Sequence, residues 1–140
     1  MRVVYEKIDE NAKLPTLATD GSACYDVYAL DNVLLFPGEK AKIRTGLAFE
    51  CPPGWFLDIR PRGGVSFSGI RIMNSPGTYD SDYRGEMFIF IKNEGDEYCW
   101  IKSGDRIAQF RLDRIYPIEF VEGKLSETNR GSGHLGSTGR

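Results

Sequence analysis

Alternation of apolar and polar residues over residues 40–50, KAKIRTGLAFE, most constrains the fold. This period of two is typical of a β-strand with one buried face. Residues 55–62, WFLDIRPR, alternate in the same way, whereas residues 86–93, EMFIFIKN, are apolar on both faces, as in a strand buried on both sides. Glycine and proline separate these runs, and no segment has a helical period longer than a turn or two. Many short strands between such turns predict an all-β sandwich or barrel.

The length of 140 residues fits one domain. The three cysteines, Cys24, Cys51 and Cys99, form no CxxC pair, and their odd number argues against a disulfide framework. The N-terminus has no apolar leader, and no run approaches the roughly 18 apolar residues of a membrane span. We therefore expect a cytoplasmic protein with no membrane association. The net charge is -2, whereas proteins that bind long nucleic acids usually carry a large positive charge. We therefore expect no nucleic-acid partner.

The last residues, LSETNRGSGHLGSTGR, differ in composition from the rest. They are rich in Gly, Ser and Thr and have almost nothing to bury, which predicts a β domain over residues 1–124 and a flexible C-terminal arm over residues 125–140. One interpretation of the arm is a disordered tail. The other is a segment that wraps a polyphosphate, because glycine N–H groups, the hydroxyls of Ser137 and Thr138 and the charge of Arg130 suit an anion.

Three further places carry groups suited to chemistry. RPRGGVS, residues 60–66, sets arginines beside glycines whose N–H groups suit phosphate oxygens, although a surface strand that ends in a turn has the same pattern. Gln109 is a polar residue in an apolar strand and needs hydrogen-bond partners. The segment GTYDSDYRGE, residues 77–86, follows Pro76. Pro76 and Gly77 favour a tight turn in which the glycine is free to take a positive φ. An aspartate after that turn either stabilises the turn or serves as a general base.

Taken in order, five segments resemble the five motifs of the trimeric deoxyuridine triphosphatase (dUTPase) family. They are GSACYDVYA (21–29), PRGG (61–64), NSPGTYDSDYRGE (74–86), GDRIAQF (104–110) and RGSGHLGSTG (130–139). The resemblance covers essentially the whole chain. It implies a jelly-roll-like β subunit, the β-clip of that family, in a homotrimer whose three active sites lie at subunit interfaces, each closed by the arm of a neighbouring chain. It also implies hydrolysis of dUTP to dUMP and pyrophosphate, with Mg²⁺ held mainly by the triphosphate.

The resemblance implies a role for each matched residue. Asp80 is the expected water-activating carboxylate, with Asp82 as the structural member of the pair. Asn74 is the expected uracil-binding residue, and Tyr83 the expected aromatic group under the deoxyribose. Asp26 is expected to support the metal and phosphate region indirectly, through water. The other expected substrate-binding residues are Arg62, Gly63, Gly64, Gly77, Thr78, Tyr79, Phe88, Gln109, Arg130, Leu135, Gly136, Ser137 and Thr138.

The chain departs from the family's usual motifs at several positions. Gly63 replaces the serine of the usual PRSG, and Leu135 stands where the usual GGFG has phenylalanine, so a slower enzyme is expected. Tyr79 occupies a position that is usually aliphatic, which could alter how tightly the base pocket closes. A non-catalytic relative that binds nucleotide or protein is therefore an alternative. A second alternative, dCTP deaminase, shares the fold but would need a glutamate where this chain has Phe90.

Overall fold

The structure is a computed structural model, and it describes residues 1–134. The described chain forms antiparallel strand pairs and one short helix, which confirms the predicted all-β, jelly-roll-like class. In chain order the elements are β1 (Val4–Lys7), β2 (Tyr25–Tyr28), β3 (Val33–Leu35), β4 (Lys40–Glu50), β5 (Trp55–Arg60), α1 (Gly63–Phe67), β6 (Ile70–Ile72), β7 (Gly77–Tyr79), β8 (Glu86–Asn93), β9 (Cys99–Ile101) and β10 (Arg106–Arg114). No helix of the described residues is long and apolar enough to cross a membrane.

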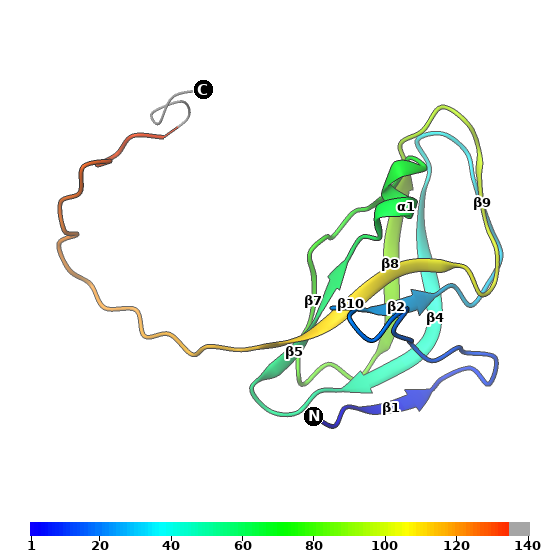
Figure 1. Ribbon diagram of the computed structural model, residues 1–140, viewed down its shortest axis with the longest axis horizontal. Helices are drawn as coiled ribbons and strands as arrows, with labels where there is room; N and C mark the ends of the chain where they lie inside the picture. The colour runs from blue at the N-terminus through cyan, green and yellow to red at the C-terminus, as the bar shows by residue number, and fades with distance from the viewer. Residues whose placement is uncertain (135–140) are drawn as a thin grey trace.

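Two four-stranded sheets, in the orders β1-β4-β8-β6 and β2-β10-β5-β7, form the body of the molecule (Figure 1). Strands β3 and β9 form a third, two-stranded sheet. The long alternating segment forms β4, in which Ile43, Thr45 and Leu47 are buried and Lys42 is exposed, as the period of two predicts. Strand β4 pairs with β1 on one edge and with β8 on the other.

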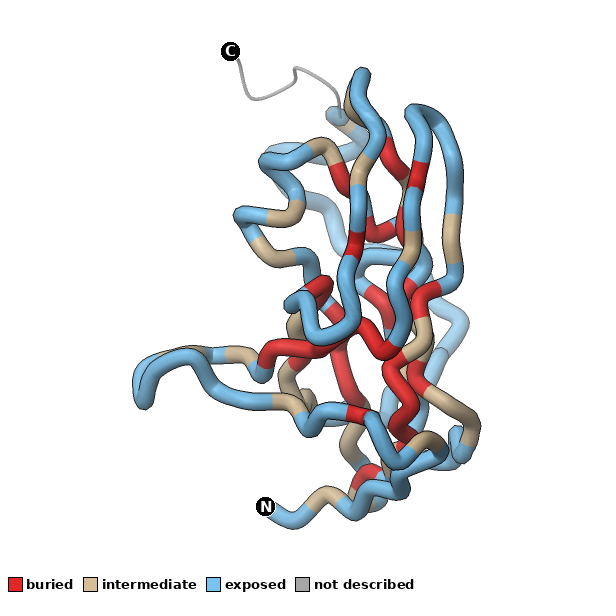
Figure 2. Tube along the Cα trace, turned by 90° about the vertical axis from the view of Figure 1, so that its right-hand side faces the viewer, coloured by how far each residue is buried: buried red, intermediate tan, exposed pale blue. Residues whose placement is uncertain are grey.

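The core lies between the two four-stranded sheets and is built from aliphatic side chains of both. Ile43 and Ile89 of one sheet and Leu57 and Ile59 of the other are each 1% exposed. Figure 2 shows the buried segments running through the middle of the molecule, with exposed loops around them. Burying a side chain of this size contributes about 1.5–3 kcal/mol to the free energy of folding. The packed sheets therefore stabilise the ends of the loops that connect their strands.

Strand β8 is buried on one face only, and the prediction of burial on both faces was wrong. Met87, Ile89 and Ile91 are buried in the core. On the opposite face Phe88 is half-buried and Phe90 is exposed. The two phenylalanines made this face look like core in the sequence, but they border a pocket instead.

The short helix α1 was not predicted. Its five residues occupy the place where the sequence suggested a turn after β5. None of them is buried, so the segment has no apolar stripe from which a helical period could be recognised. Gly63 and Gly64 open this helix and are both exposed.

The chain leaves the body after β10. Residues 115–134 contain no helix or strand and extend away from the two sheets (Figure 1). Ile118, Phe120 and Val121 in this segment are between 71% and 90% exposed. The last strand ends at Arg114, and the boundary predicted at residue 124 lies within this segment, which has no helix or strand.

All three cysteines are free thiols. Burial raises the pKa of the Cys51 thiol and of the Cys99 thiol above the ordinary value. Because the thiolate is the reactive form, burial makes both thiols less reactive at neutral pH than an exposed cysteine.

A glycine in the middle of β4 holds the N-terminal loop against the sheet. Gly46 has a φ of +69°, and the pairing of β4 with β8 shifts register between Arg44 and Ala48. A Cβ at Gly46 would lie 2.9 Å from Ala12 Cβ, which is closer than such atoms approach. Only glycine combines this backbone conformation with this contact.

We predict that Gly46→Ala lowers the free energy of unfolding by about 2–4 kcal/mol, because it adds a steric clash to the positive-φ cost. Gly38→Ala is the matched control, since Gly38 has a φ of +81° and open space around it. Its expected loss is about 1–2 kcal/mol. Urea unfolding at one fixed protein concentration measures both. Equal losses in the two variants would contradict the role assigned to the contact with Ala12.

Candidate functional site

The segment from β7 to β8 carries the aspartate pair and is called the hairpin below, although its two strands belong to different sheets. It begins where the chain crosses from one sheet to the other. Residues 73–76 leave β6 and lead into β7, where Gly77 pairs with Ile59 of β5. Gly77 does not have the positive φ that the sequence suggested. Glycine is needed there for a different reason, because a Cβ would lie 2.8 Å from Asn74 O and 3.0 Å from Asn74 Nδ2. The close approach keeps the Asn74 amide against the turn.

A pocket of about 210 Å³ opens beside this hairpin. Its lining consists of Asn74, Thr78, Tyr79, Asp80, Tyr83, Phe88 and Phe90. All of these except Phe90 were predicted as site residues, so the fold brings them together. Among the lining residues, Asp80 is the single acidic one, and Phe90 adds an apolar wall where a deaminase would need a carboxylate. One amide, one carboxylate and several rings suit a flat, polar heterocycle.

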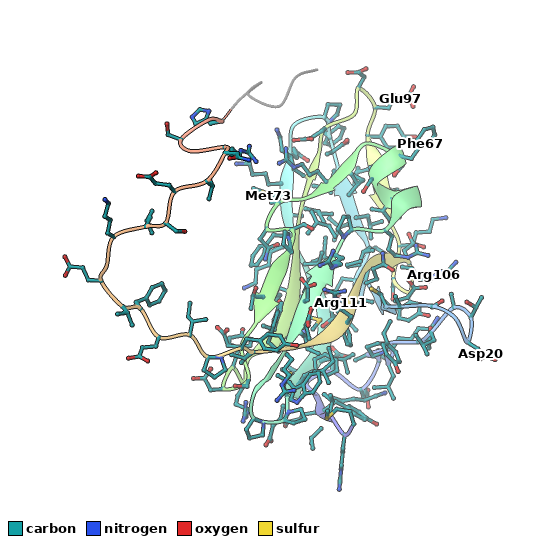
Figure 3. The ribbon with its side chains drawn as sticks, turned by 60° about the vertical axis from the view of Figure 1, so that its left-hand side comes forward. Asp20, Phe67, Met73, Glu97, Arg106 and Arg111 are labelled. Atoms are coloured by element: carbon teal, nitrogen blue, oxygen red, sulfur yellow. The ribbon has the colours of Figure 1, made fainter. Side chains whose placement is uncertain are left out.

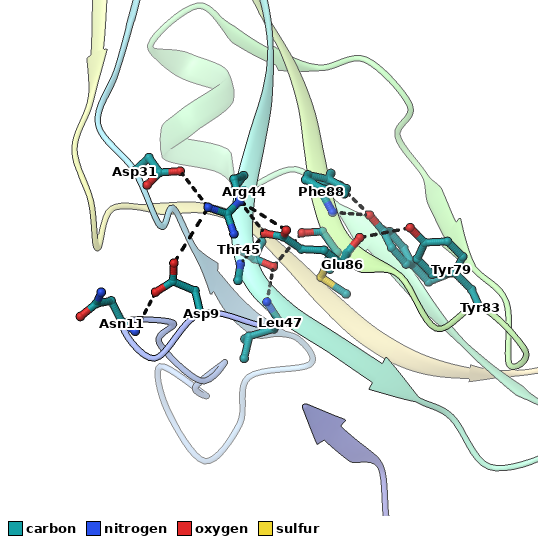
Figure 4. Close-up of polar contacts among 12 residues, drawn as sticks. Asp9, Asn11, Asp31, Arg44, Thr45, Leu47, Tyr79, Tyr83, Glu86 and Phe88 are labelled. Atoms are coloured by element: carbon teal, nitrogen blue, oxygen red, sulfur yellow. Dashed lines mark hydrogen bonds and ion pairs between the residues drawn. The ribbon is translucent and has the colours of Figure 1, made fainter. Parts of the chain in front are cut away.

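Two tyrosines shape the pocket. The Tyr79 hydroxyl donates to Phe88 O at 2.6 Å and accepts from Phe88 N–H at 2.7 Å (Figure 4). The ring of Tyr83 meets that of Tyr79 edge to face, with centroids 5.6 Å apart, and the Tyr83 hydroxyl donates to Glu86 O at 3.2 Å. Burial raises the pKa of Tyr79 from 10.0 to about 12, so its hydroxyl keeps its proton at neutral pH.

The carboxylate of Asp80 is available for chemistry. Asp80 is exposed at the edge of the pocket, and its side chain makes no hydrogen bond or ion pair with any residue in 1–134. Its backbone is held instead, since Asp80 O accepts from Tyr83 N–H at 3.2 Å. The Asp82 carboxylate also lacks a partner among the described residues, so the single chain gives it no structural bond.

Sequence reasoning missed an ion-pair network at the base of this hairpin. Glu86, whose side chain is 10% exposed, accepts from Arg44 Nε at 3.2 Å and from Gly46 N–H at 2.8 Å (Figure 4). Arg44 Nη1 also lies 3.9 Å from Asp31 and 4.0 Å from Asp9. The contact joins residues more than forty positions apart, and a single sequence carries no signal of such a pairing.

A second group of predicted residues forms around Asp26. This carboxylate is 4% exposed and accepts from Arg62 Nε at 2.7 Å and from Arg106 Nη1 at 3.2 Å. Arg106 was not predicted, although it lies in the GDRIAQF motif. Gln109 Nε2 donates to Pro61 O at 2.8 Å and so ties β10 to the segment that carries Arg62. Two guanidinium groups against one carboxylate leave net positive charge, which favours binding of an anion.

Asp26 and the start of the hairpin lie at opposite edges of one sheet. The strand order β2-β10-β5-β7 places Asp26 on β2 and Gly77 on β7. Three strand spacings lie between them, or about 14 Å. Figure 3 shows Arg106 and Met73, the residue that precedes Asn74, on opposite flanks of the body. No hydrogen bond or ion pair in residues 1–134 joins the pocket residues to Asp26, Arg62 or Gln109.

The arm lies apart from both groups. Arg130 is exposed, and its Nε donates to Gly133 O at 3.1 Å within a local turn of the extended segment. The predicted residues Leu135, Gly136, Ser137 and Thr138 lie outside the described residues.

The protein itself offers few metal ligands. No group of three or more His, Cys, Asp or Glu side chains within residues 1–134 is arranged to hold a metal ion. Asp26 already binds two arginines. Mg²⁺ in nucleotide sites is commonly bound through one or two carboxylates and the substrate phosphates, and Asp26 is the buried carboxylate beside this cationic group.

The fold combines a heterocycle-sized pocket that has a free carboxylate with a cationic group suited to phosphate, which are the two features that a nucleotide-binding β protein needs. The dUTPase family model matches residues 10–139 of the chain. The deoxyuridine 5'-triphosphate nucleotidohydrolase of Nautilia profundicola is 41% identical over 142 aligned positions, covering 100% of both chains. That of Helicobacter pylori is 38% identical and covers 99% of this chain and 97% of its own. The chain belongs to the dUTPase family.

Solved structures agree with this assignment. A mutant dUTPase of Staphylococcus bacteriophage 80alpha, solved with dUpNHpp, has a TM-score of 0.89 at 28% identity and covers 99% of each chain. A mutant dUTPase from phage phi11 of S. aureus, described with a structural Mg(II) ion, has a TM-score of 0.82 at 25% identity and covers 91% of this chain and 100% of its own.

The raised pKa of Tyr79 predicts a stability loss at high pH. The folded-state pKa lies above the unfolded value, so this contribution is complete below pH 10 and is lost as the pH rises to about 12. Urea unfolding of the native protein and of Tyr79→Phe across this range checks it. We expect the native protein to lose more stability than the variant between pH 10 and 12. Parallel curves would contradict the assignment.

Proposed function

We propose that this chain hydrolyses dUTP to dUMP and pyrophosphate, with Asp80 as the general base. The observation that carries the proposal is the Asp80 carboxylate, which stands without a partner among the described residues at the rim of a base-sized pocket. A carboxylate in this state can align a water molecule and take its proton as the water attacks the α-phosphorus in line with the leaving pyrophosphate. Membership of the dUTPase family supports the same reaction.

The pocket supplies the proposed selection for uracil and deoxyribose. The Asn74 amide and the backbone groups from Thr78 to Asp80 offer donors and acceptors to the edge of the base. A cytosine would leave some of these groups unpaired, which is costly for a buried contact. Gly77, Phe88 and the narrow turn limit the space for a substituent on the ring. Tyr83, fixed against Tyr79, would lie under the deoxyribose and leave no room for a 2'-hydroxyl.

The triphosphate needs cations, and the pocket lining contains no Lys or Arg. Arg62, Gly63, Gly64 and Gln109 would contact the phosphates, and Asp26, which accepts from Arg62, lies three strand spacings, or about 14 Å, from the hairpin in the same chain. We therefore place each active site at an interface, where the hairpin of one chain meets the Asp26 group of another in a homotrimer. Arg130 and the arm residues Leu135, Gly136, Ser137 and Thr138 would close the site from a neighbouring chain.

Exposed apolar surface supports the association of chains. A groove of about 360 Å³ is lined by apolar side chains that include Tyr5, Phe49 and Phe110. Ile118 and Phe120 of the extended segment are also exposed. A second chain that covered these side chains would remove apolar area from water, which favours association.

We propose Mg²⁺ as the cofactor and the cytoplasm as the setting. When bound to the triphosphate, Mg²⁺ neutralises charge on the leaving pyrophosphate. Asp26 would face this region through water while it holds Arg62 and Arg106 in position. The three free cysteines fit a reducing compartment.

We predict that Asp80→Asn lowers the turnover of dUTP by about 10²–10⁴-fold, the usual contribution of a general base. Binding of dUpNHpp should stay within a few-fold of the native value, because the amide keeps the shape of the carboxylate. Asp82→Asn is the matched control, and we expect it to keep most of the native rate. Pyrophosphate release and calorimetric titration measure the two quantities. A fully active Asp80→Asn variant would rule out Asp80 as the base, and a native protein that binds dUpNHpp without turnover would be a binding module.

A further inference from the structure

One edge of β8 loses its strand partner at the pocket. Met73 N–H donates to Phe90 O at 2.8 Å, just beyond the end of β6. Groups of residues two apart in a strand point to the same edge, so the N–H and C=O of Phe88 face the place where β6 would continue. The chain has instead crossed into β7, which belongs to the other sheet. Without a substitute, two backbone groups of Phe88 would lack partners.

The Tyr79 hydroxyl is that substitute. A phenol can donate one hydrogen bond and accept another, and Tyr79 does both, at 2.6 Å to Phe88 O and at 2.7 Å from Phe88 N–H. The Tyr79 side chain thus supplies the two hydrogen bonds that the backbone of a longer β6 would make with Phe88. It reaches from β7 of one sheet to β8 of the other, and it is the residue immediately before Asp80 (Figure 4).

This bridge fixes two walls of the pocket. Tyr79 and Phe88 both line it, so their hydrogen bonds set the distance between β7 and β8. Each ring has a further contact that holds it: Tyr83 lies against Tyr79, and Lys42 Nζ lies 3.6 Å from the centroid of the Phe88 ring. The two hydrogen bonds therefore hold these walls together.

We propose that the Tyr79 hydroxyl is a specificity-determining group that sets the width of the base pocket and so excludes a methyl group at C5 of the uracil ring. This inference rests on the proposed function, because it concerns the same pocket and the same nucleotide. Tyr79 acts through the position of Phe88 and of the hairpin, and is a positioning residue. A hydrophobic pocket discriminates a single methyl group by about 10–200-fold, so a small widening removes a measurable part of the selection.

The test compares kcat/KM for dUTP and for dTTP in the native protein, in Tyr79→Phe and in Thr45→Val. We expect Tyr79→Phe to lower the ratio of dUTP to dTTP by about tenfold, with KM for dUTP rising more than kcat falls. Thr45→Val is the control, because the Thr45 hydroxyl donates to Met87 O at 2.7 Å on the edge of β8 that faces β4. It should lose stability and keep the ratio. An unchanged ratio in Tyr79→Phe, or an equal fall in both variants, would overturn the proposal.

Two further measurements separate this proposal from the proposed reaction. The ratio of the Kd values for dUpNHpp and for the corresponding thymidine analogue, measured by calorimetry, reports the pocket even in a protein that has no turnover. Tyr79→Phe should reduce that ratio by about the same factor. If the variant does not fold, hydrogen exchange of the native protein decides. The Phe88 N–H, which donates to the Tyr79 hydroxyl and not to β4, should be protected from exchange, and rapid exchange at Phe88 would overturn the bridge.

Discussion

The need to pair backbone hydrogen bonds along β8 governs the arrangement of the pocket. Over its second half, β8 has β4 on one edge and β6 on the other. Over its first half it keeps β4 and loses β6, because the chain crosses to the other sheet between Ile72 and Gly77. The crossing leaves the first half of β8 at the edge of its sheet, and Phe88 and Phe90 of β8 line the pocket there. Buried backbone groups are rarely left unpaired, so the Tyr79 hydroxyl is as much a part of the fold as of the site.

The same crossing explains why Asp80 can be both fixed and reactive. Tyr79, the residue before it, is held by the bridge to Phe88, and the backbone carbonyl of Asp80 accepts from Tyr83 N–H. The base of the hairpin is held by the pair of Arg44 and Glu86. The Asp80 carboxylate itself has no partner among the described residues. In contrast, Asp26 is buried and bound by two arginines, so the two aspartates have different environments that suit different tasks.

Much of the fold could be predicted from the sequence, because alternation in β4 and turn residues between runs are local signals. The burial of β8 could not, because Phe88 and Phe90 are apolar whether they face core or pocket. The Gly77 conformation was missed for a similar reason: glycine serves a close approach as well as a positive φ. The residues that line the pocket could be predicted, except for Phe90, from their positions in the motifs. The ion pairs Arg44–Glu86 and Asp26–Arg106 could not, because they join residues far apart in the sequence.

In the proposed function, the hairpin that carries Asp80 in one chain and the Asp26 group of another chain, which includes Arg62, form one active site. Mixing Asp80→Asn chains with Arg62→Gln chains, unfolding them together and refolding them tests this claim most directly. Each variant alone should be inactive. In mixed trimers with rotational symmetry, roughly a quarter of the sites would combine an intact Asp80 with an intact Arg62, and dUTP turnover should reappear in that proportion. A refolded mixture no more active than the separate variants would contradict the shared site.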